Sequence, residues 1–179
     1  MRKLLFCGLL AAWLVPGLRA TTLLQLSLND MIQQSTVIVQ GTAQPSYSAF
    51  RGSVIYTHYL VHVSQVMKGN AGGYIDVAVL GGAANGLRQS YAGAPTLAPG
   101  QQYVMFLWTS KTGLTQVIGL SQGLFTLMPG ASGQATAVRA ASAERMLNNA
   151  GQEVSDSELK FSLSDLKTRI QGVLGGAAK

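Results

Sequence analysis

The chain has a single cysteine among its 179 residues, and that cysteine lies at position 7, inside the N-terminal apolar segment. A domain without paired cysteines has no disulfide, so packing and hydrogen bonding alone must hold it together. Acidic side chains are also scarce, with 7 Asp and Glu against 13 Lys and Arg. Histidine occurs only twice, at His58 and His62. These shortages leave few side chains for thiol, metal or acid–base chemistry.

The longest apolar run lies at the N-terminus, where residues 1–20 read MRKLLFCGLLAAWLVPGLRA. A positively charged start, the apolar stretch Leu4–Val15 and a Pro-Gly break predict a secretory signal peptide, cleaved after Ala20 or after Gly17. The alternative is an N-terminal membrane anchor, but the run is short for spanning a bilayer. We therefore expect a periplasmic or secreted protein with no stable membrane span after signal removal.

Signal removal would leave a single domain over 21–179 and would take Cys7 with it. Lipidation of this cysteine is disfavoured, because Phe6 stands where a lipoprotein signal has a small residue. The loss of three basic residues reduces the 13 Lys and Arg to 10, against 7 acidic residues, for a formal charge of +3. These ten basic residues are scattered along the chain, so we do not expect binding to nucleic acid.

Two segments carry the signals of a helix start. Ser27 is followed three residues later by Asp30, a capping pattern that predicts a short helix over 28–34. Residues 161–166 repeat the pattern. Apolar residues then recur at spacings of three and four, which predicts a second helix over 163–174.

Between the two helices, runs of β-branched and aromatic residues alternate with Gly and Pro, which predicts strands. The expected strands cover 36–41, 53–66, 74–79, 103–108, 114–120, 123–128 and 135–140. Residues 141–160 are compatible with a short helix at 143–149 or with a loop. This pattern predicts an all-β fold with flanking helices: a small OB-like closed barrel with a short N-terminal helix and a C-terminal helix. A sandwich is the alternative.

The order of these segments resembles the netrin-like module, an OB-type barrel found in tissue inhibitors of metalloproteinases, netrins and complement components. It also resembles a group of uncharacterised exported bacterial proteins with a Gly-rich loop. The matching segments are STVIVQGTA (35–43), QVMKG (65–69), YIDVAVLGG (74–82), GGAANGLRQSYAGAPTLAPG (81–100), APGQQYVMFLW (98–108), GLSQGLF (119–125) and the closing helix.

The resemblance implies an OB-type fold and a role in binding other proteins. The netrin-like family includes protease inhibitors. Metalloproteinase inhibitors of this family begin with a cysteine whose amino group and carbonyl chelate the zinc of the target. Here the processed chain would begin at Thr21, and the disulfides that anchor such an N-terminus are absent. The zinc-chelating mechanism is therefore not implied for this chain.

The two histidines raise the question of a metal site. On a helix, His58 and His62 would share one face and could share a zinc ion. The surrounding residues favour a strand, however, where side chains four positions apart are separated by roughly 13 Å. We therefore interpret them as two partly exposed strand histidines and expect no metal.

Residues 119–123 match the G-x-S-x-G pattern of a hydrolase nucleophile elbow. That elbow requires a helix after the serine and a histidine later in the chain, whereas a strand follows Ser121 and both histidines precede it. A β-turn explains the match better. The acidic stretch 153–158 lacks the pattern of a calcium loop and is expected to be solvated, and 81–86 lacks the ending of a phosphate loop. We expect no catalytic residue and no cofactor.

The remaining feature is the long Gly- and Ala-rich loop over 81–100. Long loops in compact domains are often functional, and Arg and Tyr favour the centres of interfaces. Arg88 and Tyr91 are therefore candidates for recognition. The alternative is that Leu87, Tyr91 and Leu97 plug one end of the barrel.

Together these patterns predict a non-catalytic exported binding module that engages or inhibits another exported protein such as a protease. The candidate contact residues are Thr21, Arg88 and Tyr91, at a barrel end formed by 21–24 and the loop. The alternative is a structural or assembly component of the cell envelope, in which strand edges pair between copies.

Overall fold

The structure is a computed structural model that describes residues 21–130 and 133–176, so the expected signal peptide lies outside the described residues. It contains two helices, α1 (Leu28–Gln34) and α2 (Leu163–Gly176). The strands are β1 (Thr22–Leu24), β2 (Val37–Arg51), β3 (Val54–Lys68), β4 (Tyr74–Leu80), β5 (Gly82–Ala84), β6 (Leu87–Gln89), β7 (Gln102–Thr109), β8 (Thr115–Val117), β9 (Leu124–Pro129), β10 (Ala135–Arg139), β11 (Arg145–Leu147), β12 (Glu153–Val154) and β13 (Leu159–Ser162). Neither helix in the described ranges is long and apolar enough to cross a membrane.

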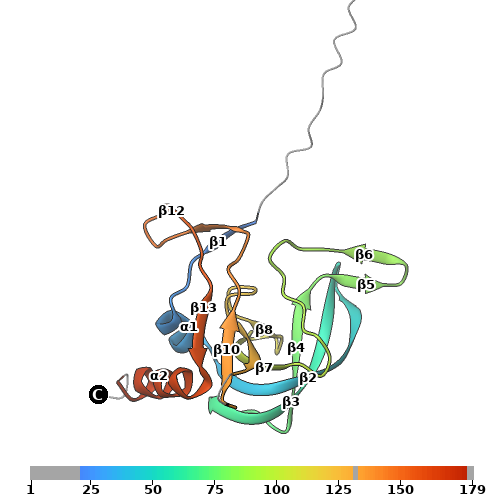
Figure 1. The fold of residues 1–179 in the computed structure, drawn as a ribbon. Coiled ribbons are helices and arrows are strands. Elements are labelled where there is room, and N and C mark those ends of the chain that lie inside the picture. Colours follow the sequence, from blue (N-terminus) through green and yellow to red (C-terminus); the bar gives the residue numbers. More distant parts are fainter. Residues whose placement is uncertain (1–20, 131–132, 177–179) are drawn as a thin grey trace, which may run out of the picture.

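Eight strands form one antiparallel sheet, which is strongly curved (Figure 1). Its order is β13-β10-β9-β7-β2-β3-β4, and β8 pairs with the second half of β7. The ladder ends at β4 on one side and at β13 on the other, so the described strands do not close into a barrel through hydrogen bonds. The β-rich fold with two flanking helices is confirmed, whereas the closed barrel is not.

The curvature comes from the long hairpin of β2 and β3, because both strands contain bulges. The register of β2 with β3 shifts at Ile38/Val39, Gln40/Gly41 and Ala43/Ser46. Pro45 lies within the last of these irregularities, a position where a residue without an N–H is tolerated. At Gly41 the two backbones approach so closely that a Cβ would lie 2.6 Å from the carbonyl oxygen of His62. Bulges increase the twist of a hairpin, which lets this sheet fold back over its own side chains.

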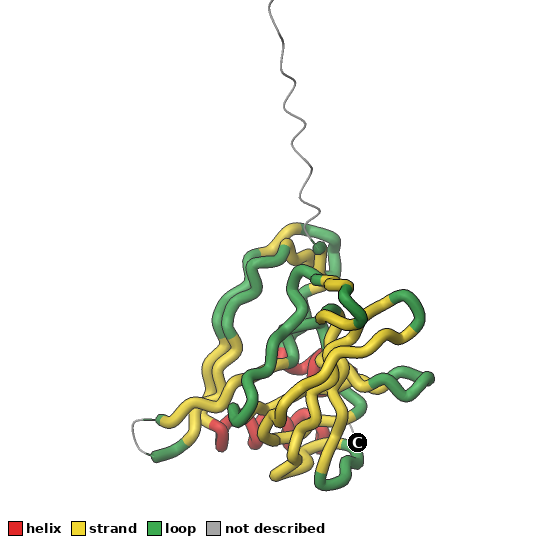
Figure 2. Tube along the Cα trace, turned by 90° about the vertical axis from the view of Figure 1, so that its right-hand side faces the viewer, coloured by secondary structure: helices red, strands yellow, loops and turns green. Residues whose placement is uncertain are grey.

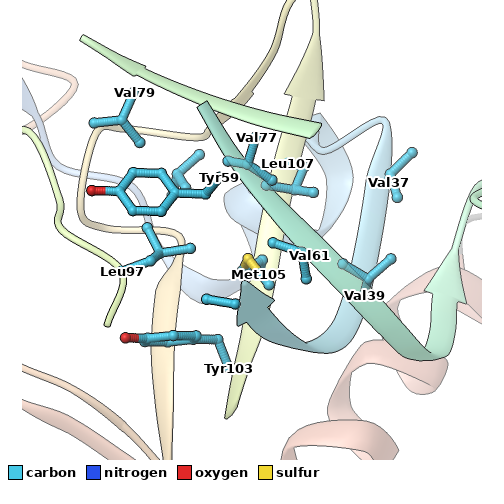
Figure 3. Packing of buried hydrophobic residues seen from close by; sticks show 12 residues of the cluster. Val37, Val39, Tyr59, Val61, Val77, Val79, Leu97, Tyr103, Met105 and Leu107 are labelled. Carbon is cyan, nitrogen blue, oxygen red and sulfur yellow. The ribbon is translucent and has the colours of Figure 1, made fainter. Parts of the chain in front are cut away.

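One face of the curved sheet packs on itself (Figure 3). Its buried side chains are Val37, Val39, Ala43, Tyr59, Val61, Val77, Val79, Leu97, Tyr103, Met105, Leu107 and Val117. All but Leu97 lie on strands of the sheet. Leu97 belongs to the segment that follows β6, and it is 1% exposed. The loop after β6 is therefore anchored in this core.

The opposite face of the sheet is covered by the two helices. Its buried side chains are Met31, Ile32, Ile38, Val104, Phe106, Phe125, Leu127, Ala137, Leu166 and Ile170. Alternation along β2 explains the division, because Ile38 points to this face and its neighbours Val37 and Val39 point to the other. In Figure 1 both helices lie together beside β10 and β13, and Figure 2 shows short strands and loops at the end of the molecule away from the helices.

Side chains at both ends fix α1. Ser27 caps its start and Asp30 bonds back to the backbone of Ser27, so the predicted capping box is confirmed. At the other end, Lys68 Nζ donates to the carbonyl oxygens of Ile32 (2.7 Å) and Gln33 (2.8 Å), which α1 itself leaves unpaired. Burial lowers the pKa of Lys68. The second predicted helix is also confirmed, as α2.

The suggested helix over 143–149 is wrong, because β11 occupies its centre. β11 pairs in parallel with β1 and antiparallel with β12. The buried side chain of Gln122 attaches this small sheet to the rest of the molecule: its Oε1 accepts from Leu26 N–H (2.8 Å) and its Nε2 donates to the carbonyl of Leu24 (2.9 Å). Three-residue strands leave little local signal, since their pairing is decided by distant segments.

Candidate binding cleft

The segment after β4 begins with a β-hairpin rather than an irregular loop. β5 and β6 pair across the two-residue turn Asn85-Gly86. Both turn residues have positive φ, 50° and 75°, which is the geometry that Asn-Gly favours in a tight hairpin. The expectation of a loop throughout 81–100 is therefore corrected for residues 82–89. The Asn-Gly pair was the sequence signal for it.

Gln89 fixes this hairpin to the start of β3. Its Oε1 accepts from Ile55 N–H at 2.7 Å, and its Nε2 donates to the carbonyl of Ser53 at 2.9 Å. The entry to the hairpin is held as well, since Gly81 N–H donates to the carbonyl of Ile55 (2.8 Å) and Thr57 Oγ1 donates to the carbonyl of Gly81 (2.8 Å). Backbone and side-chain bonds thus position β5 and β6 at one end of the sheet.

The chain then returns across the end of the core. Leu97 is buried there, and the backbone N–H of Ala98 donates to the hydroxyl of Tyr103 at 2.8 Å. Leu87 and Tyr91 remain 61% and 39% exposed. The alternative in which loop side chains cover one end of the core is therefore correct for Leu97 and wrong for Leu87, while Tyr91 is only partly covered.

A cleft of about 290 Å³ lies between the sheet and this returning segment. Its lining is Thr57, Tyr59, Val79, Leu80, Gly81, Gly82, Ala83, Arg88, Gln89, Ser90, Tyr91, Ala94, Pro95 and Thr96. Two of the three candidate residues, Arg88 and Tyr91, are thus brought together. Both side chains are exposed to solvent, and neither has a hydrogen-bond or ion-pair partner among the described residues.

Thr21 does not line the cleft. It immediately precedes β1, whose partner β11 begins at Arg145. The neighbouring Glu144 lies against the returning segment, since a Cβ added to Gly93 would be 3.0 Å from its Cγ. In Figure 1, β1 and the β5–β6 hairpin lie at the same end of the molecule, to its two sides. The structure therefore places Thr21 at the expected end but separates it from Arg88 and Tyr91.

The histidines lie on β3, as expected for strand residues. His58 Nδ1 is 2.9 Å from Asp76 Oδ2 on β4, and its ring stacks on Tyr47 at 5.0 Å and 8°. The ring of His62 is 5.1 Å from that of Tyr74. Over 21–130 and 133–176, no three His, Cys, Asp or Glu residues gather in a way that could hold a metal ion.

The G-x-S-x-G match forms the turn between β8 and β9, as expected. Gly119 has φ +60°, and a Cβ on Gly123 would lie 2.8 Å from the carbonyl oxygen of Phe106. The turn and the close approach to β7 thus account for the two glycines. Leu120 also has a positive φ of 59°, a conformation that is uncommon for a residue with a side chain.

The sequence reasoning missed one member of the cleft, Tyr59 on β3. Its ring is 6% exposed and belongs to the inner core, yet its side chain also lines the cleft. Alternation along the strand predicts that Tyr59 is buried, but only the tertiary arrangement shows that its hydroxyl end reaches the cleft.

Comparisons of the chain with family models, with curated proteins and with solved structures found no match.

Proposed function

We propose that this protein is an exported, non-catalytic binding module that engages another exported protein through the cleft between the sheet and residues 81–96. The observation that carries this proposal is that Arg88 and Tyr91 line the same cleft, whose shape is held by hydrogen bonds. Arg and Tyr contribute more binding energy at interfaces than most residues. A cleft that is already formed also loses little conformational entropy on binding.

Binding without catalysis is supported by the chemistry of the lining. The described lining residues offer one guanidinium group, several hydroxyls and backbone groups. It contains no carboxylate or imidazole that could move a proton at neutral pH. The sequence of residues 1–20 supports export. We propose a protease among the possible exported partners, on the basis of the netrin-like resemblance alone.

We also propose that the curved part of the sheet is an OB-type barrel of the netrin-like kind. Its support is the position of β4 and β8, which line a small common cavity although they share no ladder. OB-type barrels are often partly open. An experimental structure in which β4 and β8 lie far apart would argue against this assignment.

Site-specific photo-crosslinking tests the binding proposal. A photoreactive phenylalanine analogue replaces Tyr91 in one variant and Tyr47 in another. Tyr47 is 61% exposed and lies on β2, outside the cleft lining. We expect a discrete crosslinked partner from the exported fraction at position 91 and none at position 47. Equal crosslinking at both positions, or none at position 91, would contradict the proposal.

The second candidate function is assembly of the cell envelope through strand edges. Its support is β13, which pairs with β10 on one side and has no strand on the other among the described residues. Unpaired edges can pair with a second chain. Size-exclusion chromatography over a range of concentrations distinguishes the two functions: assembly predicts growing oligomers, and the binding module predicts a constant monomer.

A further inference from the structure

The cleft has an uneven charge distribution. Arg88 is the one charged residue in its described lining, and no Asp or Glu contributes to it. The acidic side chain of Glu144 lies against Gly93 of this loop but does not line the cleft. A ligand in the cleft would therefore meet a positive charge that no described lining residue neutralises.

Tyr59 adds a second and independent feature. Its side chain is 6% exposed, and its hydroxyl, which makes no hydrogen bond among the described residues, is not one of their fully buried polar atoms, so it is open to solvent. By contrast, the equally buried Tyr103 accepts a bond from Ala98 N–H at 2.8 Å. Figure 3 shows the Tyr59 hydroxyl at the edge of the core cluster, pointing away from Met105 and Val61. The apolar body of this side chain is held in the core, while its hydroxyl remains free to donate a hydrogen bond to a ligand in the cleft.

The remaining free groups of the cleft are also donors. Ser90, Tyr91 and Thr96 carry exposed hydroxyls with no side-chain hydrogen bond among the described residues. Thr57 and Gln89 are already engaged in holding Gly81 and the start of β3. The available groups are thus a guanidinium and hydroxyls around a space of about 290 Å³.

We infer that this cleft binds a carboxylate of the partner polypeptide, with Arg88 and the Tyr59 hydroxyl as the principal donors. The inference rests on the proposed function, because it names the chemical group that the partner presents. A carboxylate matches a guanidinium in charge and can accept two of its hydrogen bonds. A single cation is too little for nucleic acid, which requires several phosphate contacts. The volume fits one side chain or one chain end, since it lies below the usual range for larger ligands.

The carboxylate can come from an Asp or Glu side chain or from the C-terminus of the partner, and three short peptides separate these sources. The probes are acetyl-Gly-Glu-Gly-amide, acetyl-Gly-Gln-Gly-amide and acetyl-Gly-Gly with a free C-terminus. Each is titrated into the isotopically labelled protein, produced from the full chain, while backbone amide resonances are followed by NMR. Titration to about 20 mM suffices, because one charge-assisted contact gives millimolar affinity.

We expect the glutamate peptide or the free C-terminus, but not the glutamine peptide, to shift the amide resonances of Gly82, Ser90 and Tyr91. Arg88→Ala should weaken this binding about 10-fold or more, because it removes the counter-charge, and Tyr59→Phe about 3-fold or more, because it removes one hydrogen bond to the carboxylate. Lys111→Ala removes an exposed cation from the turn between β7 and β8 and should change it less than about 2-fold. The amide spectrum of each variant without peptide verifies that it is folded.

Equal binding of the glutamine peptide, no shift with any peptide, or an Arg88→Ala variant that binds like the wild type would overturn the inference. These results are separable from failure of the proposed function. If position 91 crosslinks a partner but no carboxylate binds, the binding module stands and the carboxylate does not. If a carboxylate binds but no partner crosslinks, the cleft is a carboxylate site, and the proposal that it engages an exported partner fails.

Discussion

At the residue scale, Asp156 and Arg139 form an ion pair that is almost completely buried. The acidic stretch 153–158 was expected to be solvated, but the side chains of Asp156 and Arg139 are only 3% and 7% exposed. Arg139 donates to both carboxylate oxygens, at 2.7 and 2.8 Å, and also to the carbonyl of Ser157. Ser142 N–H donates to the same carboxylate. This pair ties the segment after β10 to the segment before β13.

Asp156→Asn should destabilise the fold strongly, because it leaves a buried guanidinium without a counter-charge. We expect a loss of about 3 kcal/mol in the free energy of unfolding, measured by chemical denaturation at pH 7. Glu153→Gln is the matched control, since Glu153 and Arg145 form an exposed pair. It should cost less than about 0.5 kcal/mol. Similar losses in both variants would refute the buried pair.

The same pair predicts a dependence of stability on pH. Burial alone would raise the pKa of Asp156, but hydrogen bonds from Arg139 and Ser142 and the charge of Arg139 hold the pKa below its ordinary value of 3.8. A lowered folded pKa stabilises the fold above pH 3.8, and this contribution is lost as the pH falls through the folded pKa. Denaturation from pH 6 to below pH 3 should show a loss that Asp156→Asn lacks. An identical pH dependence in the variant would count against this account.

At the element scale, short elements form where local bonds and distant packing agree. α1 has only seven residues, too few to be stable alone, and depends on its cap, on Lys68 and on the buried Met31 and Ile32. Its position was predictable because the capping signal lies within four residues. The β1–β11 ladder was not, since it joins segments more than 100 residues apart and each strand has three residues.

Ser27→Ala should lower the free energy of unfolding by about 1 kcal/mol, because it removes the acceptor for the Asp30 N–H. Ser27→Asp keeps an acceptor at the same position and should lower the free energy of unfolding by only about 0.3 kcal/mol. Thermal and chemical denaturation measure both. Equal stability of the two variants would show that the cap contributes nothing to α1.

Gln89→Ala should loosen the β5–β6 hairpin without unfolding the sheet. It removes two hydrogen bonds and leaves Ile55 N–H without its acceptor, a local cost of about 1–3 kcal/mol. Hydrogen exchange of the Ile55 amide and the hairpin amides should accelerate about tenfold or more. Amides of Val104 and Phe106 in the central strand serve as the reference. Unchanged hairpin exchange would mean that other contacts hold it.

At the scale of the whole molecule, the sequence predicted the β-rich fold, both helices and the end of the sheet where Arg88 and Tyr91 lie. Strand alternation and helix capping depend on residues close together in the sequence, so they can be predicted from it. The open ladder between β4 and β13 was not predictable, because closure depends on how far the hairpin of β2 and β3 bends at its bulges. The position of Tyr59 in the cleft was not predictable either, because its side chain belongs to both the core and the cleft, and only the tertiary structure shows this.

The central claim is that partner binding is concentrated at the cleft, and the affinity of the crosslinked partner tests it most directly. We compare the wild type with the double variants Arg88→Ala/Tyr91→Ala and Lys111→Ala/Tyr47→Ala, which remove one cation and one exposed tyrosine each. The account predicts that the cleft variant weakens binding by about 30-fold or more, as for loss of about 2 kcal/mol at the centre of an interface. The second variant should retain nearly full affinity. Equal affinities of the two variants would contradict the account.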